Sequence, residues 1–264
     1  MNKLFFVIGP TAVGKTSFAI DLANKLDTEI ISSDSRQIFK EMKIGTARPT
    51  EVELSKAKHH FIATHSIFDY YNASKYEFEA ISLIENLFQH KENLIVAGGS
   101  GLYIDAILFG IDDLPTIEKE LRDDLQKKYE DEGIESLRFM LKNLDPETYK
   151  KVDLRNSKRI LKALEISIQT GKPYSSFLTG QKKKRNFEPI IIVLNQDRQK
   201  LHQRINLRVD QMIEQGLENE ARELFRHRGL VPLKTVGYKE LFDYFDKNTD
   251  FETAVELIKR NTRR

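Results

Sequence analysis

The sequence contains no cysteine, and this absence excludes disulfide bonds, thiolate metal sites and cysteine nucleophiles. Long hydrophobic runs are missing as well. The first apolar run, residues 4–8, is followed directly by Gly9 and Pro10 and is too short for a signal-peptide core or a membrane-spanning helix. The lack of cysteine is consistent with a reducing compartment. We therefore expect a cytoplasmic protein that does not bind membranes.

The sequence also has no large excess of charge of one sign, because its 42 Lys and Arg and 40 Asp and Glu give a net charge of +2. This total gives no reason to expect a polyanionic partner. The charges are unevenly placed, however. Residues 112–147 hold six basic and twelve acidic residues, whereas residues 151–185 hold ten basic and two acidic residues. The near-neutral total therefore hides a basic block, which includes the run from Lys182 to Arg185.

Short apolar runs rich in Ile and Val alternate with amphipathic stretches such as residues 15–26. Gly, Ser, Asp or Pro bounds each run, which is typical of strands buried on both faces. Such strands separated by helices indicate a parallel α/β sheet. The predicted strands are residues 4–8, 29–32, 94–97 and 190–194.

Strand patterns disappear between residues 114 and 188, where helical patterns take their place. These patterns cover residues 117–130, 133–143, 145–151 and 155–169, and the last one ends at Gly171, as a helix end commonly does. We predict an all-helical insertion at residues 116–187 in a sheet domain made of residues 1–115 and 188–264. Amphipathic segments near residues 197–215, 216–228, 235–245 and 250–264 predict a helical C-terminal region.

A phosphate-binding loop is the most specific motif of the sequence. The pattern G-x-x-x-x-G-K-[ST] lies between the first predicted strand and a helix, as its mechanism requires. Its backbone N–H groups would surround an anion at a helix N-terminus, with Lys15 as a cation and the Thr16 hydroxyl placed for Mg²⁺. The alternative is a chance glycine-rich turn. The loop consists of Gly9, Pro10, Thr11, Ala12, Val13, Gly14, Lys15 and Thr16.

A loop of this kind does not by itself predict nucleotide hydrolysis. P-loop NTPases normally hold Mg²⁺ with a second acid at the end of another strand. Here the best candidate strand, residues 94–97, runs into Gly98-Gly99-Ser100-Gly101 without an acid. This departure favours a loop that holds a diphosphate for a different transfer reaction.

Two further side chains follow predicted strands. Asp34 comes after the predicted strand 29–32. Ligands of open parallel sheets bind beyond the carboxyl ends of the strands, so Asp34 is expected near Lys15. There it would act as a general base or a metal ligand. Its alternative role is a helix cap. Ser100 is placed to hydrogen-bond a leaving-group oxygen, or to cap a tight turn.

The basic block contains a helical pattern with Arg155, Arg159 and Lys162 on one face. A solvated charged surface would explain that face. The lysine run about twenty residues further on favours a phosphate-rich macromolecule as the partner instead.

Together these motifs resemble the tRNA dimethylallyltransferases of the P-loop superfamily. The matching stretches span nearly the whole chain in the family's order: residues 9–16, 32–39, 44–49, 98–103, 158–165 and 236–241. The resemblance implies transfer of a dimethylallyl group from dimethylallyl diphosphate to N6 of the adenosine 3′ of the anticodon in tRNA, with release of diphosphate. Members of the family usually continue past the position of Arg264 with a basic and aromatic segment.

The resemblance also implies roles for single residues. The loop Gly9–Thr16 would hold the donor diphosphate with Mg²⁺ on Thr16, and Asp34 would accept a proton from the adenine N6 amine or orient it. Ser100, where the family often has threonine, would stabilise the leaving diphosphate oxygen. Arg204 and Arg208, one helical turn apart, would also face the diphosphate.

The tRNA substrate is expected to be bound through its anticodon stem-loop. The target base must leave its stack to meet the donor, and recognition rests on the shape of a single-stranded loop. We expect a monomer. The expected tRNA contacts are Asp34, Ser35, Arg36, Gln37, Ser100, Arg122, Lys158, Arg159, Ile160, Leu161 and Lys162.

Two other functions remain open at this point. Lys15, Thr16 and Asp34 would also serve a P-loop kinase that phosphorylates a small metabolite or nucleotide. Two observations argue against a kinase: the second acid at a strand end is absent, and the basic face is larger than a small substrate needs. A nucleic-acid-binding module with a regulatory P-loop would leave Asp34 and Ser100 without a role.

Overall fold

The chain divides into two compact units in the computed structural model, which describes residues 1–112 and 114–263. The first, Met1–Phe109 with Lys184–Arg264, is called the sheet unit below, and the second, Gly110–Lys183, the helical unit. Asp113 and Arg264 fall inside the predicted bounds of the sheet domain but lie outside the described residues. Each unit has its own hydrophobic core.

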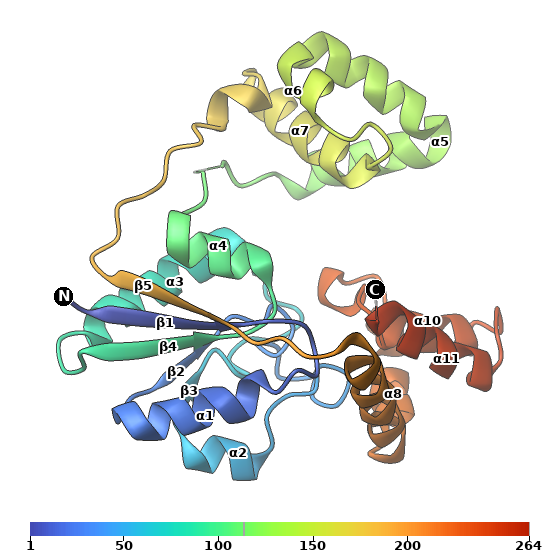
Figure 1. The fold of residues 1–264 in the computed structure, drawn as a ribbon. Coiled ribbons are helices and arrows are strands. Elements are labelled where there is room, and N and C mark those ends of the chain that lie inside the picture. Colours follow the sequence, from blue (N-terminus) through green and yellow to red (C-terminus); the bar gives the residue numbers. More distant parts are fainter. Residues whose placement is uncertain (113, 264) are drawn as a thin grey trace. The chain divides into compact units, whose positions relative to one another are not determined.

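A five-stranded sheet with the order β3-β2-β4-β1-β5 forms the centre of the sheet unit (Figure 1). All of its strand pairs are parallel. The predicted fold class, a parallel α/β sheet flanked by helices, is therefore confirmed. The strands are β1 Lys3–Ile8, β2 Ile30–Ser32, β3 His59–His60, β4 Asn93–Ala97 and β5 Glu188–Val193.

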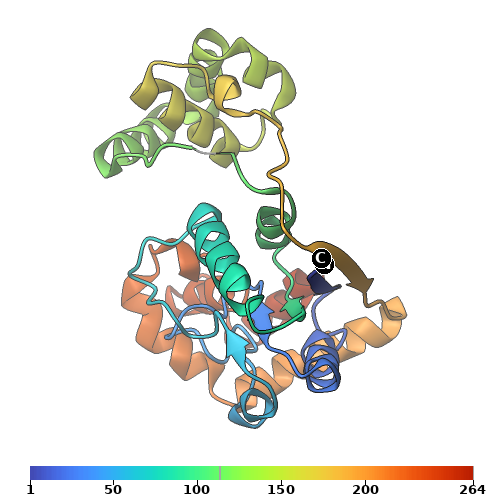
Figure 2. The same ribbon diagram turned by 90° about the vertical axis from the view of Figure 1, so that its left-hand side faces the viewer.

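Alternating side chains of the central strand pack on opposite faces of the sheet. Leu4 and Phe6 join the core formed with helices α3 (Ala73–Leu87) and α4 (Gly101–Phe109), whereas Val7 packs with α1 (Lys15–Leu26). Figure 2 shows α1 and α3 on opposite sides of the sheet. The short helix α2 (Glu51–Lys56) packs beside α1.

The burial of the edge strand β5 differs from the prediction, which expected every apolar run to be buried on both faces of the sheet. Ile191 and Val193 are 53% and 65% exposed. The strand has a neighbour on one side only, because β5 pairs with β1 at the end of the strand order. A short apolar run predicts a strand, but its composition does not tell a central strand from an edge strand.

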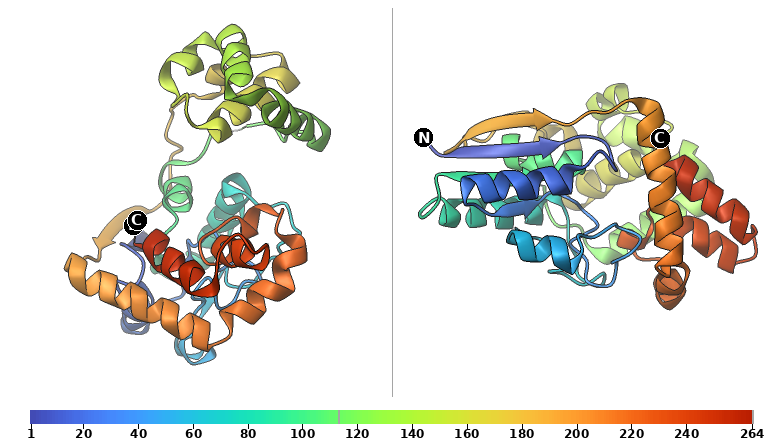
Figure 3. Two further views of the ribbon diagram at one scale, coloured as in Figure 1. Left: turned by 90° about the vertical axis from the view of Figure 1, so that its right-hand side faces the viewer. Right: turned by 60° about the horizontal axis from the view of Figure 1, so that its bottom comes forward.

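The C-terminal helices lie beyond the carboxyl ends of the strands (Figure 3). Val209, Leu217 and Leu241 from these helices share one core with Ile38 and Met42. Helix α8 thereby reaches the end of the sheet where β1 and β2 finish. Among the described helices, none is both long and apolar enough to cross a membrane. The elements are α8 Arg198–Glu214, α9 Leu217–Leu224, η2 Phe225–His227, η3 Val231–Leu233, α10 Tyr238–Phe245 and α11 Phe251–Thr262.

The helical unit packs its helices around Leu125, Leu137, Ile160 and Leu164. The predicted helices 117–130 and 133–143 form one element that is broken at Gly133, whose φ of 77° interrupts the helix. The unit consists of α5 Lys119–Leu144, α6 Pro146–Lys151, α7 Ser157–Thr170 and η1 Tyr174–Phe177.

Candidate active site

The phosphate-binding loop connects β1 to α1 and depends on glycine at two positions. Gly9 and Gly14 have φ values of 149° and 108°, which L side chains rarely adopt. A Cβ atom on Gly9 would also lie 2.4 Å from the carbonyl oxygen of Leu194. The loop is therefore seated against the residue that follows β5.

Lys15 lies over this loop, and its Nζ donates to the carbonyl oxygens of Gly9 at 3.0 Å and Pro10 at 2.8 Å. Burial lowers the pKa of Lys15, the nearby Asp34 carboxylate raises it, and Arg208 lowers it. These influences show that the ammonium group shares one electrostatic environment with an acid and a second cation.

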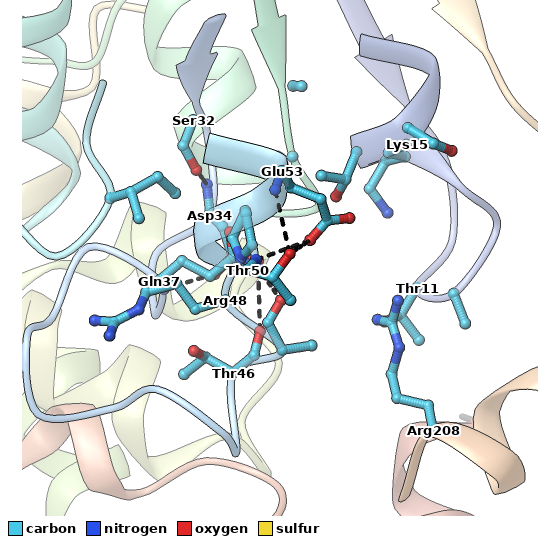
Figure 4. Close-up of a pocket in the computed structure, with 18 of the residues that line it drawn as sticks. Thr11, Lys15, Ser32, Asp34, Gln37, Thr46, Arg48, Thr50, Glu53 and Arg208 are labelled. Atoms are coloured by element: carbon cyan, nitrogen blue, oxygen red, sulfur yellow. Dashed lines mark hydrogen bonds between the residues drawn. The ribbon is translucent and has the colours of Figure 1, made fainter. Parts of the chain in front are cut away.

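A cavity of about 470 Å³ opens at this end of the sheet. Figure 4 shows Lys15, Thr11 and Arg208 on one side of it and Asp34, Gln37 and Thr46 on the other. One side is thus cationic and the other carries a carboxylate. The lining includes Thr11, Ala12, Gly14, Lys15 and Thr16 of the loop, and Arg204, Arg208, Gln211 and Met212 of α8.

Helix α8 supplies two of the cations predicted to face a diphosphate. Arg204 and Arg208 are one turn apart and both line the cavity. Burial lowers the pKa of Arg208, Arg204 lowers it further, and Glu53 raises it. With Lys15, the two guanidinium groups place three positive charges around the phosphate-binding loop, which suits a multiply charged anion such as a diphosphate.

Asp34 follows β2 and lines the same cavity. Its Oδ1 accepts hydrogen bonds from the backbone N–H groups of Arg36 at 2.8 Å and Gln37 at 3.2 Å. Its Oδ2 makes no hydrogen bond with any residue that the structure describes. One oxygen therefore stabilises the local turn, as the structural alternative predicts, while the second is available to a ligand.

Ser100 lies outside the lining of this cavity. Its Oγ accepts from the backbone N–H of Ser35 at 2.8 Å and donates to the Ser35 Oγ at 3.0 Å. The serine thus links the loop after β4 to the loop after β2.

Residues 43–49, which we call the wall loop, have no role predicted from the sequence. Thr46, Ala47 and Arg48 of this loop line the cavity. The Gln37 side-chain amide donates to the carbonyl oxygens of Thr46 and Ala47, both at 3.1 Å. Residues 44–49 stand out in the sequence only as one of the matching stretches, so their place in the cavity could not be inferred from them.

Glu53 is a second lining residue without a predicted role. It forms a capping box with Thr50 at the start of α2, where its Oε2 accepts from the Thr50 backbone N–H at 2.8 Å. The Thr-x-x-Glu spacing is a sequence signal for that cap. It does not reveal that the carboxylate also lies near Arg208.

Several predicted tRNA contacts lie on α7 of the helical unit. Lys158 and Arg159 are exposed, and Leu161 and Lys162 are half-buried. Ile160 is fully buried in the core of the unit, so its side chain has no surface to offer to RNA. Hydrophobic packing explains Ile160 better than substrate contact does.

Arg122 of α5 forms an ion pair with Glu165, in which Nε lies 3.0 Å from Oε1. Glu165 is buried, whereas Arg122 keeps 38% of its side chain exposed. The arginine therefore balances a buried carboxylate and still reaches the surface of the helical unit.

The basic run from Lys182 to Arg185 is not uniformly solvated. Arg185 pairs with the Glu77 carboxylate at 2.7 Å and donates to the carbonyl oxygens of Ala106 and Ile107 near the end of α4. Only 12% of its side chain is exposed. Burial and three partners commit this guanidinium to the sheet unit, so Arg185 belongs to the basic block in the sequence but not to an exposed charged surface.

The parallel sheet, the glycine-rich loop after β1 and the cationic cavity beside a carboxylate together define an α/β protein with the sequence pattern of a phosphate-binding loop. The family model for IPP transferase matches residues 37–264. The chain belongs to the IPP transferase family.

Individual relatives match over the whole length of the chain. A protein of Azobacteroides pseudotrichonymphae genomovar. CFP2 called tRNA dimethylallyltransferase 2 is 52% identical over 263 residues, which are 100% of this chain and 86% of that protein. tRNA dimethylallyltransferase 1 of Bacteroides fragilis (strain YCH46) is 51% identical over 262 residues, or 99% of this chain and 87% of that protein.

Solved structures show the same fold. The tRNA isopentenylpyrophosphate transferase of Bacillus halodurans has a TM-score of 0.70 at 34% identity and covers 100% of this chain and 84% of its own. A eukaryotic dimethylallyltransferase acting on tRNA has a TM-score of 0.82 at 25% identity, with 100% of this chain and 67% of its own covered.

Proposed function

We propose that this protein transfers a dimethylallyl group from dimethylallyl diphosphate to N6 of the adenosine 3′ of the anticodon in tRNA, and releases diphosphate. The supporting observation is the cavity itself, in which Lys15 and Arg208 lie opposite Asp34. Such a cavity suits an anionic leaving group at one side and a nucleophile that loses a proton at the other. The names of the relatives at about half identity support the same donor group and acceptor.

The diphosphate would be held by the backbone N–H groups of the loop Gly9–Thr16 and by Lys15, Arg204 and Arg208. Thr16 lines the cavity, and its hydroxyl would be a protein ligand for a magnesium ion bound with the diphosphate. Among the described residues there is no group of three or more His, Asp or Glu that could hold a metal ion. When bound, Mg²⁺ would neutralise negative charge on the leaving diphosphate.

Asp34 is the proposed base. The adenine N6 forms a bond to the allylic carbon as the carbon–oxygen bond to the diphosphate breaks, and Oδ2 of Asp34 accepts the proton that N6 loses. The Oδ1 contacts with the N–H groups of Arg36 and Gln37 hold the carboxylate in place. Assistance of the leaving oxygen by Ser100 would require its hydroxyl to leave Ser35 and reach the cavity, whose lining does not include Ser100.

The tRNA would be recognised by both units. Asp34 and Gln37 line the cavity and would lie beside the adenosine, and the proposed contacts of Ser35, Arg36 and Ser100 come from the loops after β2 and β4. Burial lowers the pKa of Arg36, and Tyr103 and Asp34 raise it. On the helical unit the proposed contacts are Arg122, Lys158, Arg159, Leu161 and Lys162. The active species would be a monomer in the cytoplasm.

Incubation of the protein with dimethylallyl diphosphate, Mg²⁺ and unmodified tRNA is expected to yield N6-dimethylallyl adenosine without ATP. Mass spectrometry of the digested tRNA measures this product. If the product does not form and the protein phosphorylates a small molecule with ATP, the kinase alternative is correct instead.

Replacing Lys158, Arg159 and Lys162 together with Ala is expected to raise the KM for tRNA. It should also reduce the slope of log affinity against log salt concentration by up to about two, because up to three phosphate contacts are lost. Filter binding at several salt concentrations measures the slope. The matched control replaces Lys127, Lys142 and Lys150, three exposed lysines of the same unit. Equal slopes in the two triple variants would assign α7 to an ordinary solvated surface.

A further inference from the structure

Glu220 of α9 binds the backbone of the wall loop through both carboxylate oxygens. Oε2 accepts from the N–H groups of Lys43 at 3.0 Å and Ile44 at 2.8 Å, and Oε1 accepts from the N–H of Gly45 at 3.0 Å. Three consecutive backbone N–H groups thus converge on one carboxylate. Hydrogen bonds to a charged acceptor are stronger than neutral ones, so this contact fixes the start of the loop.

Tyr238 of α10 completes the clamp. Its hydroxyl donates to Oε1 of Glu220 at 2.7 Å, and its side chain is fully buried. A Cβ atom on Gly45 would lie 2.7 Å from the tyrosine ring, so the loop rests directly on that ring and only glycine fits there. Burial and the Glu220 carboxylate raise the pKa of Tyr238 far above its ordinary value, which keeps the hydroxyl protonated as a donor.

The far end of the wall loop is also held. Gln37 binds the carbonyl oxygens of Thr46 and Ala47, and Ala47 has a φ of 49°, a left-handed conformation that is uncommon for alanine. The loop is therefore anchored on both sides of the residues that line the cavity. A displacement of the Glu220 end would be transmitted to this lining, because the segment between the anchors is only a few residues long.

The wall loop adds apolar surface to a cavity that is otherwise largely polar. Ile44 and Ala47 of the loop line it together with Met212, which lies one helical turn after Arg208 on α8. Figure 4 shows Thr46 of the loop on the same side as Asp34, opposite Arg208. A donor with its diphosphate at the cationic side would direct its hydrocarbon chain across the cavity towards Asp34 and the wall loop.

We propose that Glu220 and Tyr238 are positioning residues that set the length of the isoprenoid chain this cavity accepts. Neither residue lines the cavity, so they would act through the wall loop. The inference rests on the proposed function and extends it to the choice between donors of different chain length. While the loop is held, we expect a five-carbon chain to lie beside Ile44 and Ala47, whereas a ten-carbon chain would reach the loop and require it to move.

The test compares dimethylallyl diphosphate with geranyl diphosphate as donors for the full chain and the same tRNA. In Glu220→Gln, one acceptor oxygen is replaced by an NH₂ group that faces the N–H donors of the loop, so the loop loses at least one hydrogen bond. The ratio of kcat/KM for the ten-carbon donor to that for the five-carbon donor is expected to rise about tenfold, the lower end of what pocket shape contributes to selectivity. Tyr238→Phe is expected to change the ratio in the same direction and by less.

The control is Glu223→Gln, which changes an exposed glutamate on the same helix. A ratio of two rates does not depend on the fraction of folded enzyme, so lower rates with both donors at an unchanged ratio would show a purely structural role and overturn the proposal. Tyr238→Phe provides the same comparison if Glu220→Gln does not fold. If the unaltered protein transfers neither the five-carbon nor the ten-carbon group to tRNA, the proposed function itself is wrong.

Discussion

Replacing Asp34 with Asn is expected to lower kcat by about 10²- to 10⁴-fold, the range that general-base catalysis contributes, while the affinity for tRNA stays unchanged. Asparagine keeps an oxygen that can accept from the N–H groups of Arg36 and Gln37, as Oδ1 does now. It has no carboxylate to accept the N6 proton. Single-turnover rates at saturating tRNA and donor, together with the Kd for tRNA, measure both parts of the prediction.

Two further variants separate the turn from the chemistry. Asp34→Ala removes the turn acceptor as well, so its unfolding temperature should fall below that of Asp34→Asn. Asp21→Asn changes an exposed aspartate on α1 and serves as the matched control. If the kcat of Asp34→Asn is within about threefold of that of the unaltered enzyme, the loss is far smaller than removal of a general base causes. Asp34 would then only stabilise its turn.

Replacing Lys15 with Met is expected to lower kcat/KM for dimethylallyl diphosphate by about 10²- to 10³-fold, as the loss of one preorganised electrostatic contact to a leaving oxygen does. The pKa of Lys15 is lowered by its burial, but the ammonium still shares its cavity with Asp34 and Arg208. Methionine fills a similar volume without the charge. Initial rates at varied donor concentration and fixed, saturating tRNA measure the effect.

Lys25→Met is the matched control, because Lys25 is exposed in the last turn of the same helix. The control should change neither kcat nor KM. The affinity of Lys15→Met for tRNA should equal that of the unaltered chain. If Lys15→Met uses the donor normally, the diphosphate does not lie on the loop Gly9–Thr16.

Local patterns were sufficient to predict the part of the fold that carries the phosphate-binding loop. The predicted helix 15–26 coincides with α1, and the strand at 4–8 is β1 without its first residue. A buried strand, a glycine-rich turn and an amphipathic helix each have a signal within a few residues. The same is true of the position of Asp34, because the carboxyl ends of parallel strands meet at one edge of the sheet.

Contacts between distant segments could not be predicted in this way. Glu220 and the N–H of Ile44 are 176 residues apart in the chain, and Arg185 and Glu77 are 108 apart. In the sequence each of these charged residues looks like part of a solvated surface. The two-residue strand β3 is too short to show any periodicity, and the exposure of β5 depends on its place at the edge of the sheet.

The close packing of the phosphate-binding loop against Leu194 has a consequence for synthesis of the chain on the ribosome. Leu194 donates its N–H to the carbonyl of Ile8 at 2.8 Å, and the strand before it pairs with β1. The loop is among the first residues made, yet its support and the cations Arg204 and Arg208 follow the whole helical unit. A nascent chain that ends before α8 therefore carries the phosphate-binding motif without Arg204 and Arg208, so the proposed donor site would be complete only after most of the protein has been translated.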